Sequence, residues 1–247
     1  MTQAHAASNF SPKHRTESAV EAPLKEFRVG EKFIYDVSWL GIPIGLVYLE
    51  VREKIMLRGR PAFHIVALAR TSEFLTKIYP VRDQIQTFID AERHCSLEFR
   101  KNVREGRYRA HERIIYDYAQ RTGHYRSLKN KSFKEFPLES DVQDFLSAFF
   151  WFRLPDARVG QKLHVVLNGE EKNWDLEIDV QKMETKELKG NRVIPALVVE
   201  PKSRMKGMLY NRGRAWVYFS ADAPRIPIWM KIQTPWGPIS AVLRTSE

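Results

Sequence analysis

The chain has 247 residues, of which 43% are hydrophobic, so it can bury a sizeable core without a metal or disulfide framework. The single cysteine, Cys95, excludes an internal disulfide and weakens a zinc-site interpretation, and we expect it to be a small core residue. The net charge of +10 favours anionic partners, and an aromatic content of 12% favours strands over helices.

Residues 1–25 contain few large apolar side chains, and we expect this segment to be disordered. Ala4-His5-Ala6 fits the small-residue pattern found before a signal-peptidase cut, although almost nothing precedes it. We therefore expect a periplasmic or cell-envelope protein whose export signal is not present in this sequence. No apolar run approaches transmembrane length. Residues 26–247 are predicted to form a single β-rich domain.

From Lys32 onward, polar and apolar residues alternate with a period of two, which is typical of half-buried antiparallel strands. The first two strands are predicted at 33–39 and 46–53. The uncharged segment WLGIPIG, residues 39–45, is predicted to be the apolar turn that joins them. Further strands are predicted at 62–71, 83–89, 97–103 and 108–118, separated by the short turns that a meander requires.

The period changes in ESDVQDFLSAFFWFRLP, residues 139–155, where apolar side chains recur every 3.6 residues. Ser140 and Gln143 have the spacing of a capping box, and Pro155 prevents continuation, so the principal helix is predicted near 140–153. After it the strand period resumes at 163–168, 174–180, 193–200, 215–220, 228–234 and 239–243.

One helix among ten or more strands predicts a mainly β fold. We expect a large curled antiparallel sheet, a barrel or half-barrel, with the helix plugging or covering its concave side.

Known enzyme motifs are absent from the sequence: it has no nucleophile elbow, no P-loop, no dinucleotide fingerprint and no histidine pair at metal-ligand spacing. We accordingly assign no catalytic residue, no metal site and no cofactor. Carboxylates could serve a polysaccharide-acting hydrolase or lyase, with Asp83 and Asp90 at the ends of one strand and Asp141 and Asp144 in the first helical turn. We favour structural roles over catalysis for these carboxylates, either at the helix N-terminus or in a strand-end ion pair between Arg82 and Asp83.

The positive charge is concentrated in residues 93–134, which hold twelve Lys and Arg against the four acids Glu98, Glu105, Glu112 and Asp117. This stretch predicts either a basic face for an anionic partner or a solubilising surface. Nucleic acid is disfavoured because the aromatic residues in the stretch follow the strand alternation and are needed for the core. Trp236 lies in the turn TPWGP, where an exposed aromatic has no core role, so this side chain and the basic stretch are candidates for contact with an envelope protein.

Four segments appear in the order YDVSWLGIPIG (35–45), IYPVRDQIQTFID (78–90), VQDFLSAFFWFR (142–153) and ADAPRIPIWM (221–230). Together they resemble the bacterial domain-of-unknown-function family 3108, over roughly residues 27–245. The resemblance implies an exported, mostly antiparallel β protein, similar in general shape to the lipoprotein-carrier half-barrels. By position, the recurrent polar residues of the family fall here on Arg82, Asp83, Asp90, Gln143, Asp144, Arg153, Asp222 and Arg225, without an assigned role.

The function expected from these observations is that of a non-enzymatic binding module for an amphipathic or anionic ligand, such as a lipid or acylated glycan. The ligand is predicted to lie between the curved sheet and the 140–153 helix. Its apolar part would meet Trp39, Phe145, Phe149 and Trp151, and its polar head would meet Arg82, Asp83 and Arg153, with Asp144 also at the site. The alternatives are the carboxylate hydrolase or lyase and a scaffold in an envelope assembly.

Overall fold

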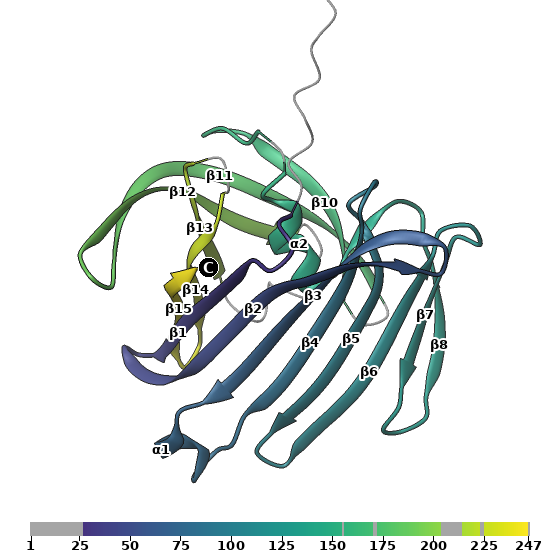
Figure 1. Ribbon diagram of the computed structural model, residues 1–247, viewed down its shortest axis with the longest axis horizontal. Coiled ribbons are helices and arrows are strands. Elements are labelled where there is room, and N and C mark those ends of the chain that lie inside the picture. Colours follow the sequence, from purple (N-terminus) through teal and green to yellow (C-terminus); the bar gives the residue numbers. More distant parts are fainter. Residues whose placement is uncertain (1–26, 155, 170–171, 204–213, 223–224, 247) are drawn as a thin grey trace, which may run out of the picture.

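The computed structural model describes residues 27–154, 156–169, 172–203, 214–222 and 225–246 (Figure 1). The predicted disordered segment 1–25 and the Ala4-His5-Ala6 pattern lie outside these residues. The described chain forms one sheet of fifteen strands with two short helices, α1 (Glu73–Thr76) and α2 (Phe145–Trp151). Neither helix is long and apolar enough to cross a membrane.

The strands form two runs on either side of α2. Those before it are β1 (Lys32–Trp39), β2 (Ile42–Leu57), β3 (Arg60–Thr71), β4 (Arg82–Asp90), β5 (Ser96–Glu105), β6 (Tyr108–Asp117), β7 (Thr122–Ser127), β8 (Phe133–Pro137) and β9 (Val142–Gln143). Those after it are β10 (Lys162–Gly169), β11 (Lys172–Leu188), β12 (Arg192–Ser203), β13 (Arg214–Ser220), β14 (Pro227–Thr234) and β15 (Gly237–Ser246).

The sheet is a meander whose two ends are β8 and β9, with β1 in the middle paired to β15. Every pairing between neighbours is antiparallel except that of β9 with β10. Within the described ranges the sheet does not close by backbone hydrogen bonds, but side chains bridge the gap between its ends. The Tyr116 hydroxyl donates to Asn168 Oδ1 at 3.0 Å, and Asn173 Nδ2 donates to the carbonyl of Pro137 at 2.9 Å. The predicted curled antiparallel sheet is therefore confirmed.

The principal helix is confirmed, but the predicted start at Ser140 is wrong. Val142 and Gln143 are buried in extended backbone as β9, because they pair with Val166 and Leu167 of β10. The helix begins at Phe145 with Asp144 as its N-cap, and the capping box joins Asp144 to Ser147 rather than Ser140 to Gln143. Asp141, predicted in the first helical turn, lies before the helix and pairs with Arg93 instead.

The apolar segment 39–45 is divided between three elements. Trp39 ends β1, Leu40 and Gly41 form the turn with positive φ angles of 51° and 81°, and Ile42 already begins β2. The predicted turn is thus shorter than expected, because Ile42 and Pro43 pair with Trp39 and Ser38 across a bulge. A glycine at position 41 suits the left-handed backbone that this turn requires.

The main core lies between the sheet and α2. Leu146 and Phe150 of the helix pack with Phe33, Phe63 and the other members of this cluster, which come mainly from β1 to β4, β14 and β15. A second cluster lies against β10 to β13, and Phe149 packs on both. Cys95 is fully buried, as predicted for a small core residue.

Candidate functional site

A groove of about 1040 Å³ crosses strands β1 to β5 and β15 and ends against α1. We call it the basic groove. It is lined by Asp36, Pro43, Gly45, Leu46, Leu68, Ala69, Arg70, Thr71, Ser72, Glu73, Thr76, Lys77, Val81, Arg82, Asp83, Gln84, Asn102, Arg104 and Arg244. Five of its charged residues are cations and three are anions.

The side chains of the basic groove stand mainly on the face of the sheet away from the core. On β3, Phe63 and Ile65 point into the main core, so Leu68 and Arg70 point to the opposite face. Gln84 pairs with Leu68 and continues the same row on β4. The groove is therefore a surface feature of the opposite side of the sheet from α2.

The cations of the basic groove differ in whether another side chain of the protein engages them. Arg244 forms an ion pair with Asp36, and Arg70 donates to the hydroxyl of Tyr48 and lies over its ring. Arg82 and Arg104 have exposed side chains that form no ion pair with any residue that the structure describes. Two guanidinium groups are thus available for an anion, and each can present a planar set of donors to a phosphate or carboxylate.

Apolar side chains lie beside these cations. Leu68 is 40% exposed on the open face of β3, and Leu46 and Pro43 line the groove from β2. A surface that puts exposed leucine next to unpaired arginine suits a ligand that is itself part apolar and part anionic.

A carboxyl pair lies at one border of the basic groove. Asp83 Oδ1 accepts a 2.8 Å hydrogen bond from the backbone N–H of Arg104, and the Asp83 carboxyl also shares a hydrogen bond with Glu105. Burial and the neighbouring Asp83 raise the pKa of Glu105 above its ordinary value, against a lowering contribution from Lys101.

The pair makes stability depend on pH. Because the folded-state pKa of Glu105 is raised, the unfolded chain loses this proton first, and stability falls as pH rises through the folded pKa. Replacing Glu105 by Gln removes that loss. We expect the urea midpoint of Glu105→Gln to increase relative to that of the parent chain as the pH rises above about 4, the ordinary pKa of a glutamate. The exposed Glu92→Gln serves as control, and parallel pH profiles for Glu105→Gln and the parent chain would contradict the shared proton.

Asp144 is held in the interior. Its carboxylate accepts from Thr87 at 2.5 Å, from Ser96 at 2.7 Å, and from the N–H groups of Leu146 and Ser147 at 2.8 Å each. Burial raises the pKa of Asp144 above its ordinary value, although these donors act in the opposite direction. The side chain is 1% exposed, so it anchors α2 to β4 and β5 and does not line the basic groove.

Arg153 is likewise buried. It forms a two-pronged ion pair with Glu31, with distances of 2.8 and 2.7 Å, and its guanidinium lies near the rings of Phe27, Phe33 and Phe150. Arg82 and Asp83 line the groove, whereas Arg153 joins α2 to the start of β1. The three residues predicted to meet one polar head are not brought together.

The predicted apolar part of the site is also divided. Phe149 and Trp151 are half-buried and pack against the core clusters, while Phe145 is 43% exposed beside the helix N-cap. Trp39 is exposed at the end of β1, where its indole N–H donates to the carbonyl of Trp236 at 3.1 Å. Trp236 itself is 77% exposed, which confirms that the predicted turn aromatic has no place in the core.

Asp90, at the other end of β4 from Asp83, is buried and pairs with Arg60 at 2.6 Å. Asp90 is seven positions beyond Asp83 along the strand, which separates the two residues by roughly 23 Å. A glycosidase pair is about 5–10 Å apart, so Asp83 and Asp90 cannot act together on one glycosidic bond. The predicted ion pair of Asp83 with Arg82 is absent among the described residues, since Asp83 instead bonds Arg104 and Glu105.

The arginines of the basic stretch 93–134 differ in their surroundings: some pair with a buried carboxylate, and one lines the basic groove. Arg100 and Arg113, with Arg58 from the β2–β3 turn, surround the buried carboxylate of Glu98 at 2.7, 2.7 and 2.5 Å. Burial raises the pKa of Glu98, but the three guanidinium donors outweigh it and hold that pKa below its ordinary value. These arginines are therefore partly neutralised, whereas Arg104 faces the basic groove.

The remaining polar positions implied by the family resemblance have structural contacts. Gln143 Nε2 donates to the carbonyl of His94 at 2.8 Å, and Asp222 accepts from the Ser220 hydroxyl at 2.5 Å. Arg225 is buried and lies 3.8 Å from Asp156. Of the eight positions, only Arg82 and Asp83 line the groove.

Sequence reasoning missed Arg70, Arg104 and Glu105. Each lies near the end of a strand, and each reaches the groove or its border through pairing with neighbouring strands. A cation near the same end of three neighbouring strands, Arg70 at the end of β3, Arg82 at the start of β4 and Arg104 at the end of β5, is the signal that could have revealed them.

The fold and the groove define a class: a curled antiparallel β sheet with a cationic groove on the face away from its covering helix. The chain belongs to the family described as protein of unknown function DUF3108, whose model matches residues 34–244. No curated protein matches the sequence.

Among solved structures, the fold is similar to a beta-barrel-like protein of domain of unknown function DUF1849 from Brucella abortus. The TM-score is 0.59 at 12% identity, covering 90% of this chain and 99% of that one. A putative exported protein with YmcC-like fold from Bacteroides fragilis gives a TM-score of 0.33 at 10% identity, covering 91% of this chain and 98% of that one. The hypothetical protein CT021 from Chlamydia trachomatis gives a TM-score of 0.38 at 12% identity, covering 89% of this chain and 87% of that one. The Brucella structure supports the β-barrel-like fold.

Proposed function

We propose that this chain is a non-enzymatic binding module of the bacterial cell envelope that holds an amphipathic anion, such as a lipid or an acylated glycan, in the basic groove. The observation that carries the proposal is the pair of unneutralised guanidinium groups, Arg82 and Arg104, beside the exposed Leu68. The proposed site lies on the opposite face of the sheet from the one expected from sequence.

The two parts of the groove have separate tasks in this proposal. Arg82 and Arg104 bind the anionic head, because charged hydrogen bonds to a phosphate or carboxylate are stronger than neutral ones. Leu46 and Leu68 cover the first part of an acyl chain and remove its surface from water. The inner face of the sheet is filled near α2 by Leu146 and Phe150, which explains why the ligand is assigned to the other side.

Titration calorimetry with dodecyl phosphate, below the concentration at which it forms micelles, tests the proposal. We expect one equivalent to bind the parent chain, and Arg82→Gln and Arg104→Gln each to weaken binding by about tenfold, the loss typical of one charge-assisted hydrogen bond. Dodecanol, which lacks the charge, and inorganic phosphate, which lacks the chain, are both expected to bind more weakly than dodecyl phosphate.

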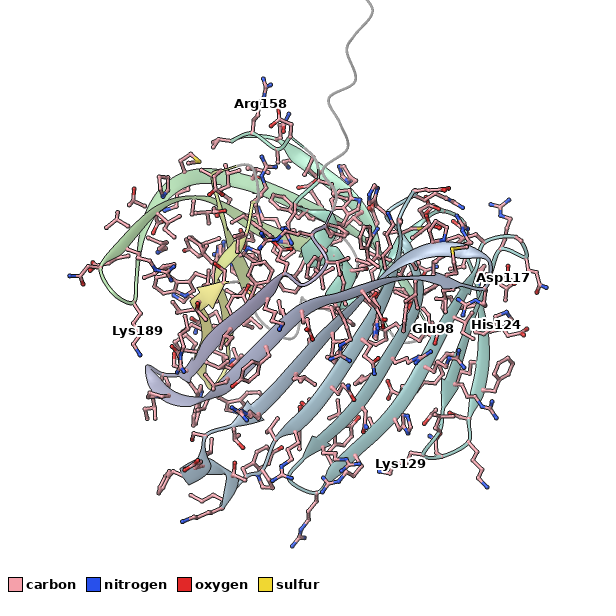
Figure 2. All side chains as sticks on the ribbon, viewed as in Figure 1. Glu98, Asp117, His124, Lys129, Arg158 and Lys189 are labelled. Atoms are coloured by element: carbon pink, nitrogen blue, oxygen red, sulfur yellow. The ribbon has the colours of Figure 1, made fainter. Side chains whose placement is uncertain are left out.

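The matched control is Arg158→Gln, since Arg158 is exposed at the opposite end of the molecule from α1 (Figure 2). Its affinity for dodecyl phosphate should equal that of the parent chain. Equal losses in Arg158→Gln and Arg82→Gln would show a diffuse charge effect and overturn the groove. Absence of binding by the parent chain would overturn it as well.

A further inference from the structure

The turns at one end of the sheet form a continuous edge. Figure 1 shows α1 and the turns between β1 and β2, β5 and β6, and β7 and β8 along the lower border of the molecule. With the β14–β15 turn, we define the hairpin rim as residues 39–42, 72–81, 105–109, 128–133 and 234–237.

Hydrogen bonds join neighbouring turns along the hairpin rim. Leu40 N–H donates to the carbonyl of Pro238 at 2.9 Å, and Ser72 N–H donates to that of Ile44 at 2.9 Å. Further along, Gly106 N–H donates to Pro80 at 2.8 Å. These bonds tie the β1–β2 turn to the start of β15, the β3–β4 connection to β2, and the β5–β6 turn to the β3–β4 connection. The rim is therefore one preformed surface and not a set of independent loops.

Exposed large apolar side chains gather on the hairpin rim. It holds ten of the eighteen such residues found among the described positions, and they are Trp39, Leu40, Ile42, Phe74, Ile78, Tyr79, Tyr108, Leu128, Phe133 and Trp236. Phe74 and Ile78 are 75% and 70% exposed. The described turns at the opposite end of the first run, 58–59, 91–95 and 118–121, carry none.

The rim is also basic. Lys77, Arg107, Arg109, Lys129 and Lys131 stand on it against only two acids, Glu73 and Glu105. The Lys129 ammonium, at the lower border in Figure 2, donates to the carbonyl of Arg109 at 2.9 Å. Glu105 shares its hydrogen bond with Asp83 and faces inward to that partner.

We propose that the hairpin rim docks this protein on the surface of an anionic lipid bilayer. Trp and Tyr favour the bilayer–water interface, and Lys and Arg beside them attract anionic headgroups. A protein partner fits this surface less well than a bilayer does. Protein interfaces are depleted in lysine at their centre, whereas the lysines of the hairpin rim lie among its exposed apolar side chains. The proposal goes beyond the proposed function, and it places the α1 end of the basic groove at the level of the headgroups.

Vesicle flotation with mixed phosphatidylglycerol–phosphatidylcholine and with pure phosphatidylcholine tests the docking. The parent chain should bind the anionic vesicles, with affinity that falls as salt rises. We expect the double variant Phe74→Ser/Trp236→Ser to lose at least about tenfold in affinity, since two large apolar side chains no longer enter the interface. Lys129→Gln and Lys131→Gln should each cost about fivefold.

The matched control is the double variant Met183→Ser/Val193→Ser, which removes two exposed apolar side chains on β11 and β12, outside the rim. It should bind as the parent chain does. A second measurement, quenching of tryptophan fluorescence by brominated phospholipid, should weaken in Trp236→Phe while binding persists. Equal binding by rim and control variants would overturn the proposal. Absence of anionic-vesicle binding by the parent chain would overturn it as well, and a cross-link to an envelope protein through Trp236 would then identify a protein partner instead.

Discussion

Replacing Arg153 by Met is expected to lower the free energy of unfolding by about 3–5 kcal/mol, because it leaves the carboxylate of Glu31 charged and buried without its partner. Both side chains are 8% exposed, and the two-pronged contact has N–O distances of 2.8 and 2.7 Å. Urea unfolding followed by circular dichroism measures the loss.

The double variant Glu31→Gln/Arg153→Met provides the internal comparison. It removes both charges, so we expect it to be clearly more stable than Arg153→Met alone. Arg158→Met, at an exposed arginine, should change stability by less than about 0.5 kcal/mol. A double variant that is no more stable than Arg153→Met would show that packing against Phe27, Phe33 and Phe150, and not charge pairing, is the main contribution of Arg153.

The second large effect is expected at Asp144. Asp144→Ala deprives four donors of their acceptor, namely the hydroxyls of Thr87 and Ser96 and the N–H groups of Leu146 and Ser147. Loss of the N-cap, which serves the two N–H groups, costs about 0.5–2 kcal/mol, and each of the two buried hydroxyls left unpaired adds about 1–3 kcal/mol. We expect a total loss of roughly 3–5 kcal/mol in urea unfolding.

Asp141→Ala is the matched control, three residues earlier in the chain. Its carboxylate is exposed and pairs with Arg93 at the surface, so the cost should stay below about 1 kcal/mol. Similar losses at Asp141 and Asp144 would mean that the helix start depends on overall charge near its N-terminus and not on the buried network.

The alternation of polar and apolar side chains was sufficient to predict the mainly β fold, because a strand with one buried and one exposed face produces this alternation. Phe33 and Tyr35 on β1 are buried, and the intervening Ile34 and Asp36 are less so, as the pattern requires. The second half of the chain was predicted equally well for the same reason.

The predicted start of the helix was wrong because the sequence offers two capping-box signals close together. Ser140 with Gln143 and Asp144 with Ser147 both have capping-box spacing. Pairing of Val142 with Val166 decided between them, and this contact depends on how the sheet curls rather than on local sequence.

The groove could not be predicted because it depends on strand register. Arg82 was identified, but its neighbour across the sheet is Arg70, a relation set by the pairing of β3 with β4. Bulges on β2, at Ile44 and Arg52, and on β5, at Leu97, shift which side chains share a face, and an alternating sequence does not reveal them. The prediction placed Arg82 and Arg153 at one polar head, whereas Arg82 is exposed and Arg153 is buried.

The pairing of the first strand with the last has a consequence for how the chain folds. Most neighbouring strands are joined by short turns and can form as local hairpins while the chain is being synthesised. The seam between β1 and β15 cannot, because it joins Ser38 to Ser240, whose hydroxyls lie 2.9 Å apart across 202 positions of sequence. Closing so long a loop is slow, and until it happens two inner strands present unpaired edges. We therefore expect the seam to form last, and this stage is when the nascent protein is most exposed to aggregation.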